Sequence, residues 1–329
     1  MRKILGVATL LCVLVISGCL SKDAVEKKPI KIAISEWAGD AHAVIAKEKG
    51  FFEKNNVDVE LIFIKEYSES QENYINGETD GIFGVYSDTI LYNLEGIETK
   101  VVCALDYSDT GDVIIGNPEL NSLADLKGKK IGIEGVNSFS HLFVLASLKK
   151  AGIEESEVQF EDIPAHKVLE ALEDGIIYAG HTWEPTKSAA LKKGYKILGI
   201  AGDVPGIITD VLSFSTEIIN ERPDDIRAIV KALLETLEYL ENSHYEDVQI
   251  MTDYMGMSKE EMEEGIDGIK MLDIDDNIKA FTKTDEIDSL YGSGKIITKF
   301  YFERGQLSSY PDFDEILEPK FVKSIKKEK

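Results

Sequence analysis

Positive charge is scarce in this sequence. Its 36 lysines and arginines stand against 60 aspartates and glutamates, which gives a formal net charge of −24 at pH 7. A chain of this charge repels the phosphate backbone of nucleic acid and the anionic surface of a membrane. Nucleic-acid binding is therefore not expected. The acidity fits a saline habitat or simple solubility, and it does not describe the charge inside a pocket.

Long hydrophobic runs are equally scarce. The one candidate extends from Ile4 to Ile16, directly after the basic residues Arg2 and Lys3. It is shorter than the roughly 20 residues that a helix needs to cross a bilayer. A basic start, a short apolar run and then small residues at Ser17 and Gly18 are typical of a secretory signal, which we predict over residues 1–18.

The end of this run also resembles a lipobox. Ile16-Ser17-Gly18-Cys19 matches the motif in which cleavage before the cysteine leaves it as a lipidated N-terminus. The charged residues that follow, up to Pro29, then form a tether over 19–29. We expect an extracytoplasmic protein held on the outer face of the cell membrane through Cys19. The alternative is an ordinary signal peptide in which Cys19 is incidental.

Cysteine is rare, with three residues in the chain. Cys12 is removed with the signal, Cys19 carries lipid, and Cys103 lies in an apolar run that is typical of a strand. The mature chain therefore has no intramolecular disulfide. Its stability has to come from an apolar core, and about 310 residues are enough for two lobes of ordinary size.

Short apolar runs alternate with helical patterns from Ile30 onward, which predicts an α/β protein with mostly parallel sheets. The expected strands of the first series are 31–35, 57–64, 81–85 and 100–105, and those of the second are 113–116, 130–134, 158–162 and 176–180, with one further strand over 207–213. Expected helices include 41–49, 69–76, 139–150 and 165–173. In the third of these, Phe139, Leu142, Phe143 and Ala146 form one apolar stripe.

The last third of the chain predicts long helices with no strand between them. Pro223 begins one that extends to about Asn242, and Ser258 with Glu261 forms a capping box for another. We expect them to cover the first lobe, which requires two crossings between lobes, near 107–111 and near 210–213. The predicted lobes are 30–108 with 212–329, and 109–211.

Five segments in order along the chain carry a resemblance to a known family. They are Ala46–Lys54 with the strand after it, Asn76–Gly81, Leu123–Gly132, Gly135–Ser138 and Thr182–Pro185. Together they resemble the nitrate, sulfonate, taurine and thiamine-precursor binding proteins of ABC importers, the NMT1/SsuA-like family, and the match spans roughly Ile30 to Ile325.

The resemblance implies a two-lobed type II periplasmic-binding-protein fold and a monomer that captures a small molecule without a cofactor. The implied partners are an ABC permease and its ATPase. The ligand class stays open between a sulfonate-like or nitrate-like anion and a thiamine-precursor-like heterocycle. Two alternatives are a pyrimidine-synthase-like enzyme, whose cysteine-rich signature is absent here, and a ligand-sensing surface receptor.

Candidate ligand contacts lie where strands end and helices begin, because free N–H groups point outward there. Asn137 and Ser138 could hold an oxyanion, although Ser138 could equally cap its helix. Ser87 and Asp88 occupy the matching turn in the first lobe. Asp88 disfavours a bare anion, and it suits a helix cap or a contact with an amine or ring nitrogen.

The only two tryptophans, Trp37 and Trp183, both follow predicted strands. That position favours aromatic walls of a cleft over the interior of a helix stripe, although core packing is the alternative. Glu184 resembles a pocket position of the family, but Pro185 after it suits a charge at a helix start equally well.

Three polar residues lie at the expected crossings, where a hinge would bring them to the cleft floor: Asp106, Ser108 and Asp210. His181 is the one histidine expected near the pocket. The five histidines show no paired spacing, so we expect no metal site. No motif of nucleophilic catalysis is present, and we expect no catalytic residues.

Overall fold

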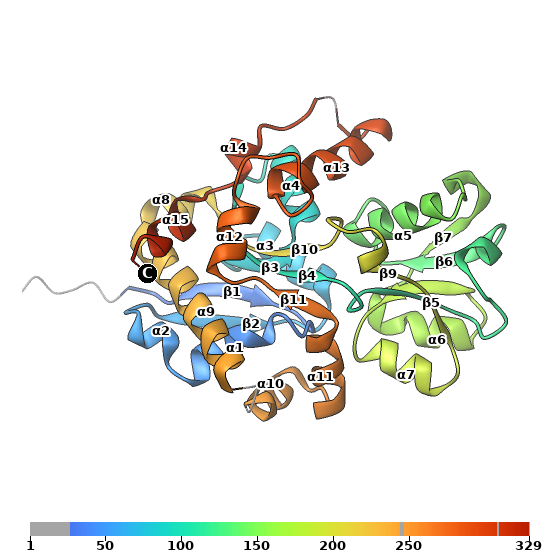
Figure 1. Cartoon of the computed structure of the whole chain (residues 1–329), viewed down its shortest axis with the longest axis horizontal. Coiled ribbons are helices and arrows are strands. Elements are labelled where there is room, and N and C mark those ends of the chain that lie inside the picture. Colours follow the sequence, from blue (N-terminus) through green and yellow to red (C-terminus); the bar gives the residue numbers. More distant parts are fainter. Residues whose placement is uncertain (1–26, 244–246, 308, 329) are drawn as a thin grey trace, which may run out of the picture.

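The computed structural model describes residues 27–243, 247–307 and 309–328. The predicted signal and Cys19 lie outside the described residues. Two sheets with helices around them form two lobes joined side by side, as Figure 1 shows.

The first lobe contains a six-stranded sheet in the order β11-β4-β10-β3-β1-β2. β1 pairs in parallel with β2 and β3, whereas β10 is antiparallel to β3 and β4, and β11 is antiparallel to β4. The sheet is therefore mixed. Its strands are β1 (Ile30–Ile34), β2 (Val59–Phe63), β3 (Gly81–Val85), β4 (Thr99–Ser108), β10 (Thr209–Ser215) and β11 (Ile269–Met271).

The second lobe contains a five-stranded sheet in the order β7-β6-β8-β5-β9. β6 is parallel to β7 and β8, and β5 is antiparallel to β8 and β9, so this sheet is mixed as well. Its strands are β5 (Val113–Gly116), β6 (Lys130–Ile133), β7 (Gln159–Asp162), β8 (Ala179–Thr182) and β9 (Lys196–Ile200).

Helices cover both faces of the first sheet (Figure 1). They are α1 (Ala41–Glu48), α2 (Phe51–Lys54), α3 (Tyr67–Ile75), α4 (Tyr86–Leu94), α8 (Thr216–Glu221), α9 (Pro223–Ser243), α10 (Val248–Met255), α11 (Lys259–Asp267), α12 (Ile274–Ala280), α13 (Leu290–Glu303), α14 (Phe313–Ile316) and α15 (Lys320–Lys326). The C-terminal helices pack on this lobe, as the sequence predicts.

The second lobe has fewer helices around its sheet. They are α5 (Phe139–Lys150), α6 (Val168–Glu173) and α7 (Thr186–Lys192), with short 3₁₀ turns η1 (Leu123–Leu126), η2 (Glu155–Glu157), η3 (Ala165–Lys167) and η4 (Ala201–Asp203).

The long helix α9 shows how the sequence positions these elements. Proline at its first position has no N–H to lose there, and Asp224 and Asp225 complement the positive end of the helix. Its apolar residues recur with helical period and are buried against the first lobe: Ile226, Ile229, Val230, Leu233, Leu237 and Leu240. Helix α11 begins with the predicted capping box of Ser258 and Glu261.

Three expectations from the sequence need correction. The sheets are mixed rather than mostly parallel, because β10 runs opposite to β3 and β4 in the first sheet and β5 runs opposite to β8 and β9 in the second. Strand β11 does interrupt the C-terminal helices. β9 was also missed, because its alternating pattern is short and follows a helix directly.

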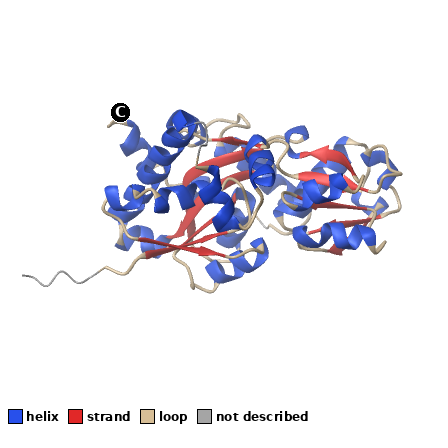
Figure 2. Ribbon diagram, turned by 90° about the horizontal axis from the view of Figure 1, so that it is seen from below, coloured by secondary structure: helices blue, strands red, loops and turns tan. Residues whose placement is uncertain are grey.

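The chain crosses between the two sheets twice. β4 in the first sheet leads to β5 in the second through residues 109–112, and β10 returns after residues 204–208. The second crossing thus lies before Asp210, a few residues earlier than expected. Figure 2 shows the lobes side by side with these connections between them. The domain boundaries drawn from the sequence stay a prediction.

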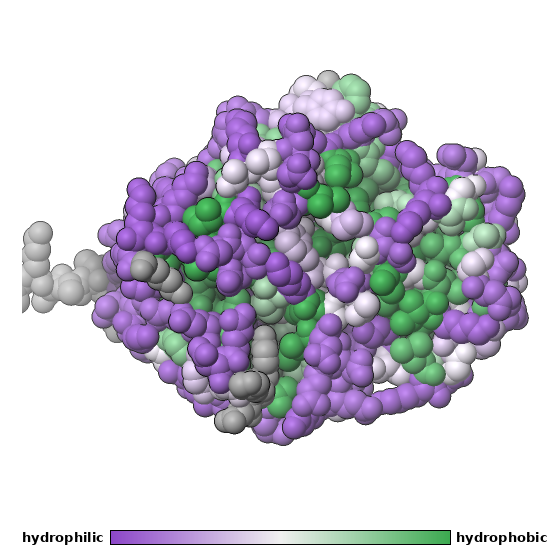
Figure 3. Space-filling model, in the orientation of Figure 1, coloured by the Kyte–Doolittle hydropathy of each residue, from purple (hydrophilic) through white to green (hydrophobic). Residues whose placement is uncertain are grey.

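Hydrophilic residues cover most of the face seen in Figure 3. This agrees with the acidic composition of the chain. Within the described residues, no helix is both long enough and apolar enough to cross a membrane.

Candidate functional site

A cavity of about 30 Å³ lies between the lobes. It holds about two water-sized groups, so any larger ligand requires the lobes to separate. Both lobes supply its wall: Ser35, Trp37, Asp40, Tyr67, Phe83, Gly84, Val85, Asp112, Phe139, Trp183, Ile208 and Asp210. Of the residues predicted from the sequence, Trp37, Trp183 and Asp210 line it.

Aromatic rings form much of the cavity wall and meet across the lobes. Trp37 follows β1 and Trp183 follows β8, and their rings are T-shaped with centroids 6.4 Å apart. Phe139, at the start of α5, lies 6.1 Å from Trp183 and 5.4 Å from Tyr67 of the first lobe. The Trp183 indole donates a hydrogen bond of 3.0 Å to the carbonyl of Glu36. The lobes are therefore in contact, and the cleft is closed.

Two carboxyl groups lie opposite each other beside the cavity, and one of them, Asp210, lines it. Asp106 of β4 and Asp210 of β10 are directly opposite in the antiparallel ladder. Burial raises the pKa of Asp106 to about 7, and the charge of Asp112 adds to the shift. Burial, then the charges of Asp106, Asp112 and Asp40, raises the pKa of Asp210 well above its usual range. The pair therefore holds a proton at neutral pH.

Close packing holds Trp37 against this pair. Its indole N–H donates to Asp106 at 3.4 Å. A Cβ at Gly39 would lie 2.3 Å from the Asp106 carboxylate and 2.7 Å from the indole nitrogen. Any larger residue at position 39 would therefore force the tryptophan and the carboxyl apart.

Asp40 and Asp112 complete the acidic wall, and both were missed as pocket residues. The sequence pattern assigned Asp40 to a helix cap, but its side chain makes no cap bond and accepts from the Ser35 N–H at 2.9 Å. Burial raises its pKa to about 8. Asp112 is the last residue of the first crossing. An acidic residue at that position was the one feature of the sequence that could have predicted its place in the pocket.

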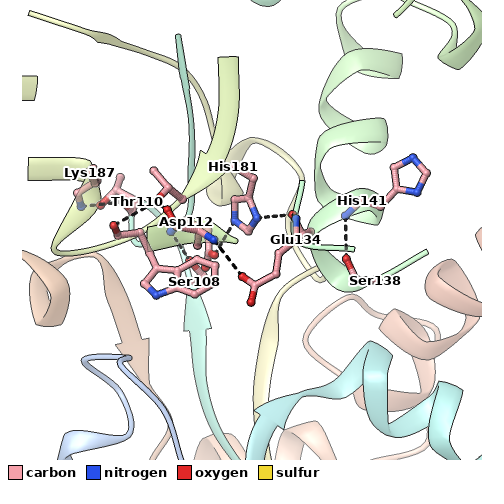
Figure 4. Close-up of polar contacts among 12 residues, drawn as sticks. Ser108, Thr110, Asp112, Glu134, Ser138, His141, His181 and Lys187 are labelled. Atoms are coloured by element: carbon pink, nitrogen blue, oxygen red, sulfur yellow. Dashed lines mark hydrogen bonds and ion pairs between the residues drawn. The ribbon is translucent and has the colours of Figure 1, made fainter. Parts of the chain in front are cut away.

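His181 lies behind the cavity wall, fully buried, and not in the cavity itself. Its two ring nitrogens lie 2.8 Å from Asp112 and 2.8 Å from the Ser140 hydroxyl, as Figure 4 shows for the contact with Asp112. The backbone N–H of Asp112 donates to the Ser108 hydroxyl at 3.0 Å. His181 and Ser108 therefore hold Asp112 in place and do not reach a ligand directly.

Ser138 and Asn137 lie at the start of α5, outside the cavity. The Ser138 hydroxyl accepts from the His141 N–H and donates to the Gly135 carbonyl, so it caps the helix (Figure 4). Asn137 has a positive φ of 72° and accepts from Arg304 of the first lobe at 3.5 Å. The expected oxyanion loop is thus occupied by its own hydrogen bonds.

Ser87 and Asp88 are buried within the first turn of α4 and do not cap that helix. The Tyr67 hydroxyl donates to Asp88 at 2.8 Å. Burial raises the pKa of Asp88 to about 7. Asp88 therefore supports Tyr67, which lines the cavity in its place.

Glu184 faces a smaller neighbouring hollow. It accepts from the backbone N–H and the hydroxyl of Ser188 and pairs with Lys187 at 3.0 Å. This matches the helix-start role that the sequence left open. Lys187 also donates to the carbonyl of Thr110 in the first crossing (Figure 4).

Among the described residues, no group of three or more His, Cys, Asp or Glu side chains is arranged to hold a metal ion. Polar contacts also join the rims of the two lobes outside the cavity. Ser68 donates to Glu134 at 3.4 Å, His166 lies 3.5 Å from Glu66, and Arg304 pairs with Glu155.

Comparison with known proteins adds a family and a fold. A family model described as "NMT1/THI5 like" matches residues 39–244. A putative binding protein of Brucella abortus is 25% identical over 251 residues, which cover 71% of this chain and 74% of that protein.

Solved structures with the same fold are more distant in sequence. The ligand-binding component of an ABC-type import system from Staphylococcus aureus has a TM-score of 0.74 at 18% identity, over 91% of this chain and 99% of that one. The alkanesulfonate-binding protein SsuA from Xanthomonas axonopodis has a TM-score of 0.74 at 14% identity, over 90% and 100%. A desulfurization enzyme also has this fold, with a TM-score of 0.69 at 13% identity, over 92% and 99%.

Proposed function

This chain belongs to the NMT1/THI5-like family, and from that premise we propose that it is the solute-binding subunit of an ABC-type importer. It captures a small molecule between its lobes and presents the closed form to a permease that an ATPase drives. The observation that carries this proposal is the cavity lined by residues of both lobes, which is too small for a larger ligand unless the lobes separate.

The two crossings, 109–112 and 204–208, are the proposed hinge. Rotation about them would separate the first sheet, which contains β4 and β10, from the second sheet, which contains β5 and β9. Opening breaks the Trp183 bond to Glu36 and parts the two tryptophans. A ligand then replaces these contacts between the lobes and stabilises the closed state.

The proposed contacts with the ligand are Trp37, Trp183 and Asp210, with Asp40, Asp112 and Tyr67 beside them. Asp106 acts through Asp210 and Trp37. The remaining predicted residues do not line the cavity: Ser87, Asp88, Ser108, Asn137, Ser138, His181 and Glu184. Of these, Asp88, Ser108 and His181 hold the wall residues Tyr67 and Asp112 in place.

We place the protein outside the cytoplasm, as the names of its relatives suggest, with a signal over 1–18 and a lipid on Cys19. Cys19→Ala tests the anchor in a host that processes lipoproteins. We expect the wild-type chain in the membrane fraction and the variant in the soluble fraction. Equal partition of the two proteins would contradict the anchor.

Fluorescence tests the capture function directly, because Trp37 and Trp183 are the only tryptophans in the chain. A panel of nitrate, sulfonates, bicarbonate, thiamine pyrimidines, riboflavin and small amines is titrated while emission and melting temperature are recorded. One solute class is expected to change both, with the solute recovered unchanged. Chemical conversion of the bound solute would support an enzyme instead. A panel without any response would contradict capture.

A further inference from the structure

The charged side chains that line the cavity are all acidic. Three aspartates, Asp40, Asp112 and Asp210, are among its lining residues, and none of those residues is lysine, arginine or histidine. Asp106 lies directly opposite Asp210 in the ladder of β4 and β10. An anion entering this space would meet carboxyl groups and no cation.

The nearest basic side chains are already paired elsewhere. Lys65 lies at the rim, where it pairs with Glu36 at 3.1 Å. Lys187 is buried against Glu184 and the carbonyl of Thr110. His181 contacts Asp112 at 2.8 Å and is not among the residues that line the cavity. No described basic group is therefore positioned to balance a bound anion.

Asp210 lacks a donor of its own. Its side chain lines the cavity and is 6% exposed, yet among the described residues no N–H group donates to it. Its polar neighbour is the carboxyl of Asp106. Asp210 shares a hydrogen bond with Asp106 and, among the described residues, with no other side chain, so one carboxyl oxygen of Asp210 is left to accept from a donor.

The rest of the wall suits a positive charge as well. The rings of Trp37, Trp183, Tyr67 and Phe139 surround the same space. Aromatic faces attract cations, and the attraction is strongest where little water competes for the cation. Together, the carboxyls and the rings supply the two kinds of contact that organic cations use.

We propose that the ligand of this cleft is a small organic cation that carries N–H donors, such as an amidinium or a protonated amine. This inference rests on the proposed capture function. The N–H groups of the cation reach Asp210 and Asp112, and its body lies between Trp37 and Trp183. The geometry disfavours the nitrate and sulfonate anions that the sequence left open.

Binding of such a cation has a proton balance that can be measured. The Asp106 and Asp210 pair holds a proton in the empty cleft, and burial together with Asp40 and Asp112 keeps it there. When the cation donates N–H bonds to Asp210, the carboxylic acid O–H bond breaks and the proton passes to the buffer. The complex then contains a carboxylate and the intact cation.

Matched probes separate charge from shape. Benzamidine, benzamide and benzoate share one flat ring and differ in charge, and acetamidine, acetamide and acetate repeat the comparison at smaller size. The whole protein is titrated with each by calorimetry in two buffers of different ionisation enthalpy. We expect binding by the amidinium probes, at least tenfold weaker binding by the amides, none by the carboxylates, and release of up to one proton near neutral pH.

Asp210→Asn is the decisive variant, because it keeps the shape of the side chain and removes the acid. Affinity for the amidinium should fall about thirtyfold or more, and proton release should fall with it. Asp174→Asn, at the exposed end of α6, makes the same charge change outside the cleft and should alter neither quantity. A melting curve checks that each variant is folded.

The titrations distinguish failure of the cation proposal from failure of the capture function. Tighter binding by a carboxylate, nitrate or a sulfonate than by any amidinium would overturn the cation and leave capture intact. Amidinium binding without proton release would also overturn the cation proposal. Amidinium binding that Asp210→Asn leaves unchanged would do the same, because either result shows that the cation does not contact Asp210. Metal ions binding in preference to organic cations would likewise refute it. Absence of binding by every solute would reject the capture function itself.

Discussion

The buried carboxyl of Asp40 makes the stability of this protein depend on pH. Asp40 is 3% exposed, and burial raises its pKa from 3.8 to about 8. The unfolded chain releases this proton near its ordinary pKa, whereas the folded protein keeps it until about pH 8. Between the two values the folded state binds one more proton. The free energy of unfolding therefore falls as the pH rises.

The size of the effect follows from linkage. Each pH unit within this window removes about 1.4 kcal/mol, so a rise from about pH 5.5 to about pH 8 costs roughly 3 kcal/mol at Asp40. In a chain of this length, that corresponds to a fall in melting temperature of roughly 6 °C. Asp88 and Asp106, whose pKa values burial raises to about 7, act in the same direction.

The substitution Asp40→Asn isolates this contribution. An asparagine keeps an oxygen to accept from the Ser35 N–H and cannot ionise. Calorimetric melting curves at a series of pH values should therefore show a smaller fall for the variant than for the wild type. Asp174→Asn, which is exposed, should keep the wild-type slope. A wild-type melting temperature that rises with pH, or a variant with the full slope, would refute the reasoning.

Three further predictions concern the closed cleft and the core. Trp183→Ala removes one aromatic wall and the bond to the Glu36 carbonyl, so the affinity for any confirmed ligand, measured by titration, should fall at least about tenfold. An unchanged affinity would show that Trp183 does not contact the ligand. Arg304→Gln breaks the ion pair with Glu155 across the lobes, so X-ray scattering of the ligand-free variant should give a larger radius of gyration than the wild type. An identical scattering curve would show that this contact does not hold the lobes together. Burial raises the pKa of Cys103 to about 12, so peptide mapping after native iodoacetamide treatment should find it unmodified, and rapid labelling would place the thiol outside the core.

Much of the architecture was accessible from local pattern. The α/β alternation, the two-lobed fold and the C-terminal helices on the first lobe follow from apolar periodicity and helix signals such as Ser258 with Glu261. The positions of Trp37 and Trp183 after strands predicted cleft walls, because loops at strand ends meet at one edge of a sheet. Such features depend on residues within a few positions of each other.

The direction of β10 was not accessible in this way. Apolar periodicity reports that a segment is a strand, but it does not report its neighbours or its orientation. In the folded chain β10 inserts antiparallel between β3 and β4. That insertion brings Asp210 opposite Asp106, a pairing between residues about a hundred positions apart.

The sequence by itself determined the acidic composition, the alternation of strands and helices, and the tryptophans at strand ends. Only the tertiary structure decided which acids meet. Asp40, Asp106, Asp112 and Asp210 come from a turn, two strands and a crossing, and they converge because both sheets direct those segments into one cleft. The charge of a pocket depends on the residues that lie close together in space. The net charge of −24 for the whole chain therefore does not predict it.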